Sequence, residues 1–392
     1  MPRPAKSAKK TAAKKDVKKG VSSGKMVAGK IILGCLAGLF LLPQCQKKQE
    51  PALAPVKLGV TPWPAENSLA SVESAYTFIQ QECDFVLHMI DDGIPYEEAF
   101  KMQPMPKALS DDIGFRKLYT GSKPVFLSVS PLNLTRKERN GYYRQSSETP
   151  ANIKLYWESL PFDHPDVIRA YVNYVDYLAE QFSAQWINFG VESNLGAWDP
   201  AAFARYKAFC AGVYTELKKS HPGIPIFISI MVNEEEQSIQ YARQLLPYSD
   251  WVALSAYPYT HIGSSSGGNS DPDQLPAGYF ERWLDLAPDK PWCFAETGYI
   301  AENLDVPEYG LSKLGNASWQ DRYLRKVGDL LHKRNGQFAV WFCYTDYDAL
   351  IPYLKASGDY QPLFLFWRDT GLFDENHQPR PALQTWRELR AK

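Results

Sequence analysis

The sequence predicts an α/β protein in which one (β/α)₈ barrel begins near residue 56. A unit made of a short apolar run, polar residues at its end and a helical pattern repeats eight times after residue 55. The runs are apolar on both faces, which is typical of strands buried in a parallel sheet. With 392 residues, 45% of them hydrophobic, the chain can supply the single large core that such a barrel needs.

Strands and helices are expected to alternate along the chain. The eight apolar runs span residues 56–60, 84–90, 124–129, 186–191, 225–230, 251–256, 291–295 and 337–344. Between them, residues 167–182, 201–217 and 319–332 carry apolar side chains three or four positions apart, which predicts helices packed on a sheet. Pro200 directly after Asp199 indicates a helix start. Eight such units close into a barrel, and residues 56–392 show no sign of a second domain.

Two long connections follow predicted strands. Residues 131–165 are polar with several aromatics, and residues 260–276 are rich in Ser, Gly and Asp. Loops that follow the strands of such a barrel lie on the rim where the strands end, so we expect both loops to shape a substrate cleft.

Residues 1–50 form a leader that we exclude from the fold. Residues 1–25 hold eight Lys, one Arg and one Asp, a net charge of +8, which leaves −9 for the rest. Residues 31–42 are uncharged, too short for the ~20 residues of a membrane span and typical of an export signal. Cys45 then stands where a bacterial lipoprotein carries its lipid. We expect export to the periplasm, cell surface or membrane, with lipidation at Cys45, plain cleavage and an uncleaved anchor as alternatives.

Composition and cysteine spacing exclude several classes of partner. An acidic body disfavours nucleic acid as the main partner, because phosphate binding needs a basic face. No Cys-x-x-Cys pair occurs, the chain has only six His, and the first predicted strand lacks His-x-His, so we expect neither a metal nor another cofactor. Lys57 is the only Lys in the eight runs and lies at the wrong end of its strand for a Schiff-base aldolase.

Two glutamates each end an apolar strand. Glu192 follows the fourth run and Glu296 the seventh, at the strand ends where barrel enzymes place their sites. Strands four and seven face each other across the mouth, so the two carboxyls are expected to meet. Retaining cleavage of a glycosidic bond needs carboxyls about 5–5.5 Å apart, with one ionised and one protonated. The alternative for each is a helix cap or an ion pair with an Arg on the rim.

Four segments resemble the large clan of retaining glycoside hydrolases, with endo-galactanases and some β-mannanases most similar. They are residues 189–194 (FGVESN), 255–258 (SAYP), 294–299 (FAETGY) and Trp341. The resemblance implies that Glu192 is the acid/base and Glu296 the nucleophile. It also implies that Tyr257 donates a hydrogen bond to Glu296 and that Trp341 forms the floor under the cleaved sugar.

One position departs from that clan. Much of the clan has Asn directly before the acid/base, where it contacts the sugar 2-hydroxyl, and this chain has Val191. We expect Asn194 to take over that contact. Further candidates for substrate binding are Trp63, Asp91 and Tyr299, each of which would also fit a packing or loop role.

The sequence therefore predicts an exported retaining glycoside hydrolase that acts on a β-linked polysaccharide or oligosaccharide. The alternative is a non-catalytic, membrane-anchored barrel that binds carbohydrate, an interpretation that Val191 and the leader favour.

Overall fold

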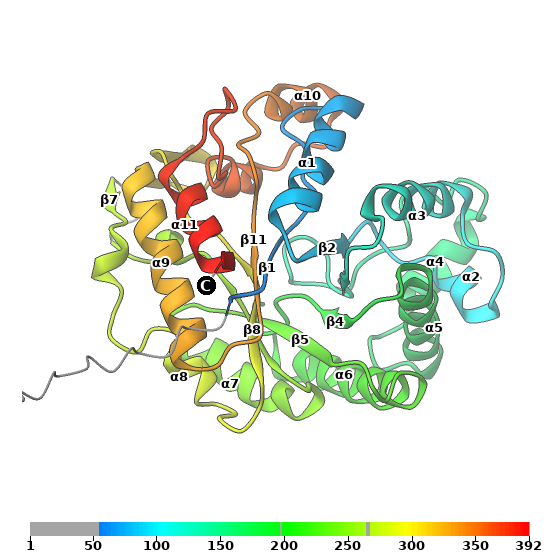
Figure 1. Ribbon diagram of the computed structural model, residues 1–392. Coiled ribbons are helices and arrows are strands. Elements are labelled where there is room, and N and C mark those ends of the chain that lie inside the picture. The colour runs from blue at the N-terminus through cyan, green and yellow to red at the C-terminus, as the bar shows by residue number, and fades with distance from the viewer. Residues whose placement is uncertain (1–54, 197, 264–266, 392) are drawn as a thin grey trace, which may run out of the picture. The chain divides into compact units, whose positions relative to one another are not determined.

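Eight parallel strands close into a barrel in the computed structural model, which describes residues 55–391 apart from 197 and 264–266 (Figure 1). The barrel strands are β1 (Leu58–Val60), β2 (Phe85–Ile90), β3 (Val125–Val129), β4 (Trp186–Gly190), β5 (Ile226–Met231), β6 (Val252–Ala256), β8 (Trp292–Thr297) and β11 (Ala339–Trp341). Each lies within or overlaps a predicted run, and β11 pairs with β1 to close the ring. The predicted fold is confirmed. The leader, with Cys45, lies outside the described residues.

Helices surround the barrel and follow most of its strands (Figure 1). They are α1 (Leu69–Glu82), α2 (Tyr96–Lys101), α3 (Lys107–Thr120), α4 (Ala151–Ser159), α5 (Pro165–Phe182), α6 (Pro200–Ser220), α7 (Glu236–Leu245), α8 (Glu281–Leu284), α9 (Ala317–Lys333), α10 (Leu350–Ser357) and α11 (Pro381–Ala391). The Asp199 carboxylate accepts hydrogen bonds of 2.8 Å from the backbone N–H groups of Ala201 and Ala202, which explains why α6 begins at Pro200. Among the described residues, no helix has the length and apolarity to cross a membrane.

The inner face of the barrel is filled by aromatic side chains that alternate with outward-facing residues. Those in the lower part of the barrel include Phe85, Phe126, Phe227, Trp251 and Phe338. Phe338 lies at the centre of this group, with ring centroids 4.9–5.7 Å from those of Phe85, Phe126 and Trp251. The interior is therefore a packed core, and any recess must lie above it at the carboxyl ends of the strands.

A small second sheet lies in the loops at the rim of the barrel, and it was not predicted. Its strands are β7 (Gly268–Asn269), β10 (Leu311–Leu314) and β9 (Leu304–Val306), in that order. These strands have two to four residues and no apolar run, so their periodicity gave no signal. The sheet joins the connection after β6 to the connection after β8.

The loop after β3 has structure of its own. It contains α4 and a tight turn, closed by an antiparallel bridge between Leu132 and Arg139. Arg136 lies in this turn with a left-handed backbone, φ 60°. The turn places a charged side chain toward the barrel mouth.

Candidate active site

Above the aromatic core, the inner face of the barrel becomes polar. Ser128, Asn188, Ser229 and Ser255 come from four successive strands, β3 to β6, and all four are buried. The Asn188 amide donates to Ser128 Oγ at 2.9 Å and to Ser229 Oγ at 3.2 Å. This polar layer is the base on which the acidic side chains lie.

Glu192 follows β4 and is held at both carboxylate oxygens. Its Oε1 accepts a hydrogen bond from Ser255 Oγ at 2.8 Å, and its Oε2 pairs with Arg136 Nε at 3.0 Å. Its backbone N–H donates to Ser229 Oγ at 3.0 Å, and its φ of 50° turns the chain at the strand end. The side chain is 12% exposed, so it is fixed in orientation while water still reaches it.

Glu296 reaches the mouth through a β-bulge. Leu254 pairs with Phe294, but the next residue, Ser255, pairs with Glu296, so Ala295 is the extra residue in β8. Without this shift, Glu296 would point outward with Phe294. The bulge places it on the inner face beside Ser255, whose hydroxyl binds Glu192.

The electrostatic surroundings connect Glu296 to Glu192. Burial, followed by the negative charge of Glu192, raises the pKa of Glu296 to about 7. The Tyr257 hydroxyl, which donates to Glu296 Oε1 at 2.6 Å, and the charge of Arg136 both act to lower that pKa. The hydrogen bond from Tyr257 is the one that the family resemblance implies.

Asp91 adds a third carboxyl to the mouth. It follows β2 on the inward-facing side of the strand and is exposed to solvent. Desolvation by the surrounding protein nevertheless raises its pKa, and the charge of Arg136 acts to lower it. Asp91, Glu192 and Glu296 thus surround one guanidinium at the barrel mouth.

Three predicted site residues are directed elsewhere, and these predictions need correction. Trp341 is 1% exposed on the outer face of β11, where its indole N–H donates to Thr370 O at 2.8 Å. The buried Asn194 amide is hydrogen-bonded to the backbone of Met231 and to the Ser238 hydroxyl. Tyr299 is buried, and its hydroxyl donates to Ser270 O. None of the three has a free face to offer to a sugar.

The next residue, Phe342, takes the inward direction that was expected of Trp341. Phe338 and Val340 belong to the inner core, and side chains alternate along a strand, so Phe342, directly after β11, continues their inward series. Phe342 packs against Trp63 at 5.6 Å and Trp367 at 6.2 Å between ring centroids, and Trp367 lies 5.7 Å from Tyr257. Trp63, Phe342 and Trp367 thus form an aromatic wall that reaches Tyr257, the residue bonded to Glu296. The role of Trp63 in substrate binding stays a prediction.

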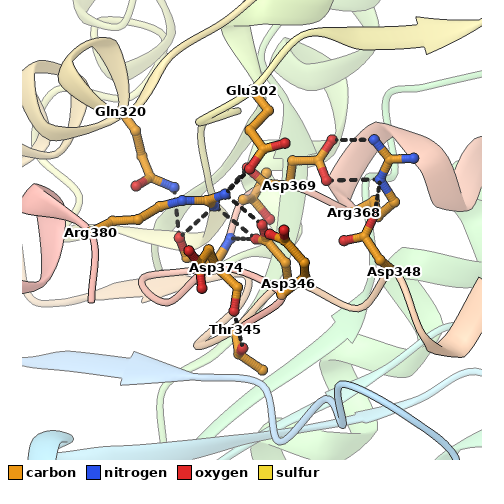
Figure 2. Close-up of polar contacts among 12 residues, drawn as sticks. Glu302, Gln320, Thr345, Asp346, Asp348, Arg368, Asp369, Asp374 and Arg380 are labelled. Atoms are coloured by element: carbon orange, nitrogen blue, oxygen red, sulfur yellow. Dashed lines mark hydrogen bonds and ion pairs between the residues drawn. The ribbon is translucent and has the colours of Figure 1, made fainter. Parts of the chain in front are cut away.

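A separate acidic cluster on the rim has carboxylates close enough to hold a metal (Figure 2). Oxygens of Asp346, Asp348 and Asp369 lie within 4.8 Å of one another, and so do those of Glu302, Asp346 and Glu375. Arg380 pairs with Asp346 at 2.6 Å, and Arg368 pairs with Asp369 at 2.7 Å. Two guanidinium groups therefore already supply positive charge to this cluster.

Sequence reasoning missed Arg136 and Phe342. Arg136 is one of several charged residues in a loop without periodicity, and nothing in the sequence marks which of them points inward. The Phe342 position could have been found by counting strand parity from Phe338.

Comparisons with known proteins identify the fold. No protein-family profile matches the chain, and no curated protein matches it. Among solved structures, a GH5_18 protein from Bifidobacterium longum subsp. longum has a TM-score of 0.58 at 16% identity over 86% of this chain and 79% of its own. A GH5_18 variant from Streptomyces cattleya in complex with Manb1-4GlcNAc gives 0.58 at 13%, covering 86% and 80%.

The exo-beta-1,4-mannosidase Op5Man5 from an Opitutaceae bacterium is also similar. It gives a TM-score of 0.56 at 15% identity over 86% of this chain, which spans 59% of the mannosidase. At these identities the similarity establishes the architecture. The chain folds as the (β/α)₈ barrel that these glycoside hydrolases also have.

Proposed function

We propose that this protein is a glycoside hydrolase that cleaves β-glycosidic bonds with retention of configuration. The observation that carries the proposal is the convergence of Glu192 and Glu296, from β4 and β8, above one polar layer. The two side chains interact strongly enough for the charge of one to raise the pKa of the other.

The proposed reaction has two steps. Glu296 attacks the anomeric carbon while Glu192 gives its proton to the departing glycosidic oxygen, which leaves a glycosyl-enzyme ester and a free alcohol. Glu192, now ionised, takes a proton from water, and the resulting hydroxide displaces Glu296 from the anomeric carbon. The Tyr257 hydroxyl holds Oε1 of Glu296, so Oε2 is the oxygen available for attack.

The charges at the site suit a pair that shares one proton. Burial and the proximity of two carboxyls disfavour the state in which both are ionised. Burial and the charge of Glu192 raise the pKa of Glu296 to about 7, so Glu296 gives up a proton unusually late. The first step needs the negative charge on Glu296 and the proton on Glu192.

Two of the similar solved structures, an exo-beta-1,4-mannosidase and a complex with Manb1-4GlcNAc, support a neutral β-linked sugar as substrate. Less similar structures, with TM-scores of 0.50–0.51, include β-glucuronidases, whose sugar is anionic. The aromatic wall of Trp63, Phe342 and Trp367 offers apolar ring faces of the kind on which sugars stack. The three carboxyls of Asp91, Glu192 and Glu296 at the mouth disfavour an anionic sugar. We therefore propose β-mannosides as the first substrates to test.

The experiment is hydrolysis of a panel of aryl β-glycosides and β-1,4-linked oligosaccharides by the wild type, Glu296→Gln and Glu192→Gln. Removing the nucleophile should lower kcat/KM by more than about 10³-fold. Removing the acid/base should cost about 10²–10⁴-fold on substrates with poor leaving groups. Proton NMR of the first-formed product should show retained configuration.

Glu308→Gln is the matched control, because Glu308 is an exposed rim glutamate. Its activity should equal that of the wild type. Normal turnover by either Glu192→Gln or Glu296→Gln would refute the proposal. If the wild type hydrolyses nothing while sugars raise its Tm, the chain would instead be a carbohydrate-binding barrel.

A further inference from the structure

The loop after β3 buries one side chain and exposes its neighbours. Arg136 is buried, whereas Leu134, Thr135, Lys137 and Glu138 are exposed. Several backbone hydrogen bonds hold the turn, including Arg136 N–H to Asn133 O at 2.9 Å and Asn133 N–H to Glu138 O at 2.9 Å. Arg136 has a left-handed backbone, which costs free energy in any residue other than Gly. The turn thus delivers one particular guanidinium to the mouth.

The Arg136 guanidinium is fixed at more than one point. Nε faces Glu192 Oε2 at 3.0 Å, and Nη1 donates to Asn133 O at 3.2 Å and to Ser130 Oγ at 3.4 Å. Its side chain is 8% exposed. A cation so shielded from water acts on neighbouring charges with little screening.

Several titratable groups face this cation and Glu192. Asp91 after β2 and Glu296 on β8 both feel the charge of Arg136. Tyr257 after β6 feels the charge of both glutamates, and Tyr206 on α6 feels that of Arg136. The tyrosines stay neutral because burial raises their pKa values well above the ordinary range. Asp91 also feels the charges of Arg116, Arg144 and Asp92, whereas Arg136 is the cation that contacts Glu192 directly.

We propose that Arg136 is a positioning residue that orients Glu192 and whose charge sets the pH range in which the carboxyl pair works. This inference rests on the proposed glycosidase function and adds a residue to it. The guanidinium favours the ionised form of both glutamates, whichever of them attacks the sugar. In the second step it also stabilises Glu192 as the base.

Removing the positive charge should make both carboxyls hold their protons to higher pH. The acidic limb of the kcat/KM profile reports ionisation of the nucleophile, and the alkaline limb reports loss of the proton from the acid. Both limbs should therefore move in the same direction, toward alkaline pH. A residue that only braces the loop would lower kcat/KM at every pH without moving either limb.

The experiment compares kcat/KM against pH for the wild type, Arg136→Gln and Arg136→Lys. Both limbs of Arg136→Gln should shift upward by about one pH unit or more. Arg136→Lys keeps the positive charge but loses the several N–H donors of the planar guanidinium. The shift of its two limbs should be less than half of that in Arg136→Gln. Unshifted limbs in Arg136→Gln, or an equal shift in Arg136→Lys, would overturn the proposal.

Arg139→Lys is the matched control. Arg139 lies in the same loop and braces it through Trp157 O and the ring of Tyr96, away from the site carboxyls. Its profile should keep both limbs in place. Should Arg136→Gln not fold, Arg136→Met takes its place in the same comparison, with the same shifts expected and the same outcomes overturning the proposal.

A direct titration separates this proposal from the proposed function. Carbon-13 NMR of labelled glutamate carboxyls, assigned with Glu192→Gln and Glu296→Gln, reads their pKa values without any substrate. Higher values in Arg136→Gln support the proposal, and unchanged values overturn it, even if no hydrolysis is found. Failure of the hydrolysis test alone would reject the glycosidase and leave this result standing.

Discussion

Two groups of acids and arginines lie at the carboxyl ends of the barrel strands, and they differ in how fully their charges are paired. On the rim, Asp346 receives two contacts from Arg380 and the backbone N–H of Gly371, all within 2.9 Å (Figure 2). At the mouth, the Tyr257 hydroxyl is the one side chain among the described residues that donates a hydrogen bond to Glu296, and a second carboxyl lies close enough to raise its pKa. A carboxylate whose oxygens are all bound by donors or cations stabilises the fold. A carboxyl pair with few such partners is free to exchange protons and to react.

The rim group joins three segments that are distant in the chain. Asp346 follows β11, Glu302 follows β8, and Arg380 directly precedes α11. Arg380 binds both carboxylates, at 2.6 Å to Asp346 and 2.5 Å to Glu302. A Cβ on Gly371 would lie 2.4 Å from the backbone N of Asp346, so this close approach requires glycine. The group acts as a clamp that ties the last helix to the barrel.

Breaking the clamp should give the largest change in stability. Arg380→Met keeps much of the apolar stem but leaves Asp346 buried without its cation. Loss of one partner of a buried ion pair costs about 3–5 kcal/mol. Chemical denaturation at pH 8 should show a loss in the free energy of unfolding of this size.

Two further measurements test the clamp: the pH dependence of stability in Arg380→Met, and the stability of a variant that breaks an ion pair elsewhere on the surface. Burial already pushes the pKa of Asp346 upward, and without Arg380 nothing comparable opposes it. The pKa of Asp346 is already raised to about 8 in the wild type. Removing Arg380 raises it further, so the deficit of the variant relative to the wild type grows as pH rises above about 8. Arg325→Met removes a half-exposed arginine that pairs with Asp321 and Glu388, and it should cost less than about 1 kcal/mol. Similar losses in both variants would contradict the comparison.

Removing the Glu296 carboxylate at the mouth should increase the free energy of unfolding, whereas removing Arg380 decreases it. The pKa of Glu296 is raised to about 7, above its value in an unfolded chain, so the folded state loses stability as pH rises from about 4.5 to 7. Glu296→Gln removes that loss, so its free energy of unfolding should exceed that of the wild type by about 3 kcal/mol at pH 8 and by very little at pH 4.5. Thermal unfolding at the two pH values measures this. A variant less stable than the wild type at pH 8 would mean that Glu296 is structural.

The sequence predicted the barrel and the two glutamates because both depend on local pattern. Eight apolar runs of strand length can be recognised from the sequence alone, and a charge directly after such a run must lie at a strand end. The direction of each side chain depends on finer features. A bulge at Ala295 turns Glu296 inward, and strand parity turns Trp341 outward and Phe342 inward.

Other site residues depend on contacts between segments far apart in the chain. Arg136 reaches Glu192 across 56 positions through a turn that periodicity cannot reveal. Asn194 was assigned to the sugar because it is polar and next to the strand end. The structure shows that its amide is committed to Met231 and Ser238, and a single sequence carries no signal for that tertiary contact.

Tyr257→Phe should have the smallest effect, a shift in the pH profile of kcat/KM. It removes the hydrogen bond to Glu296 without changing any charge. The Tyr257 hydroxyl lowers the pKa of Glu296, so its removal should raise the acidic limb of the kcat/KM profile by about half a pH unit to one unit. The alkaline limb should stay in place, because the hydrogen bonds that hold Glu192 come from Ser255 and Arg136. Tyr259→Phe is the matched control, since the Tyr259 hydroxyl donates to Phe366 O at 2.7 Å instead of to a site carboxyl. Movement of the alkaline limb in Tyr257→Phe would assign that limb to Glu296 and reverse the roles proposed for the two glutamates.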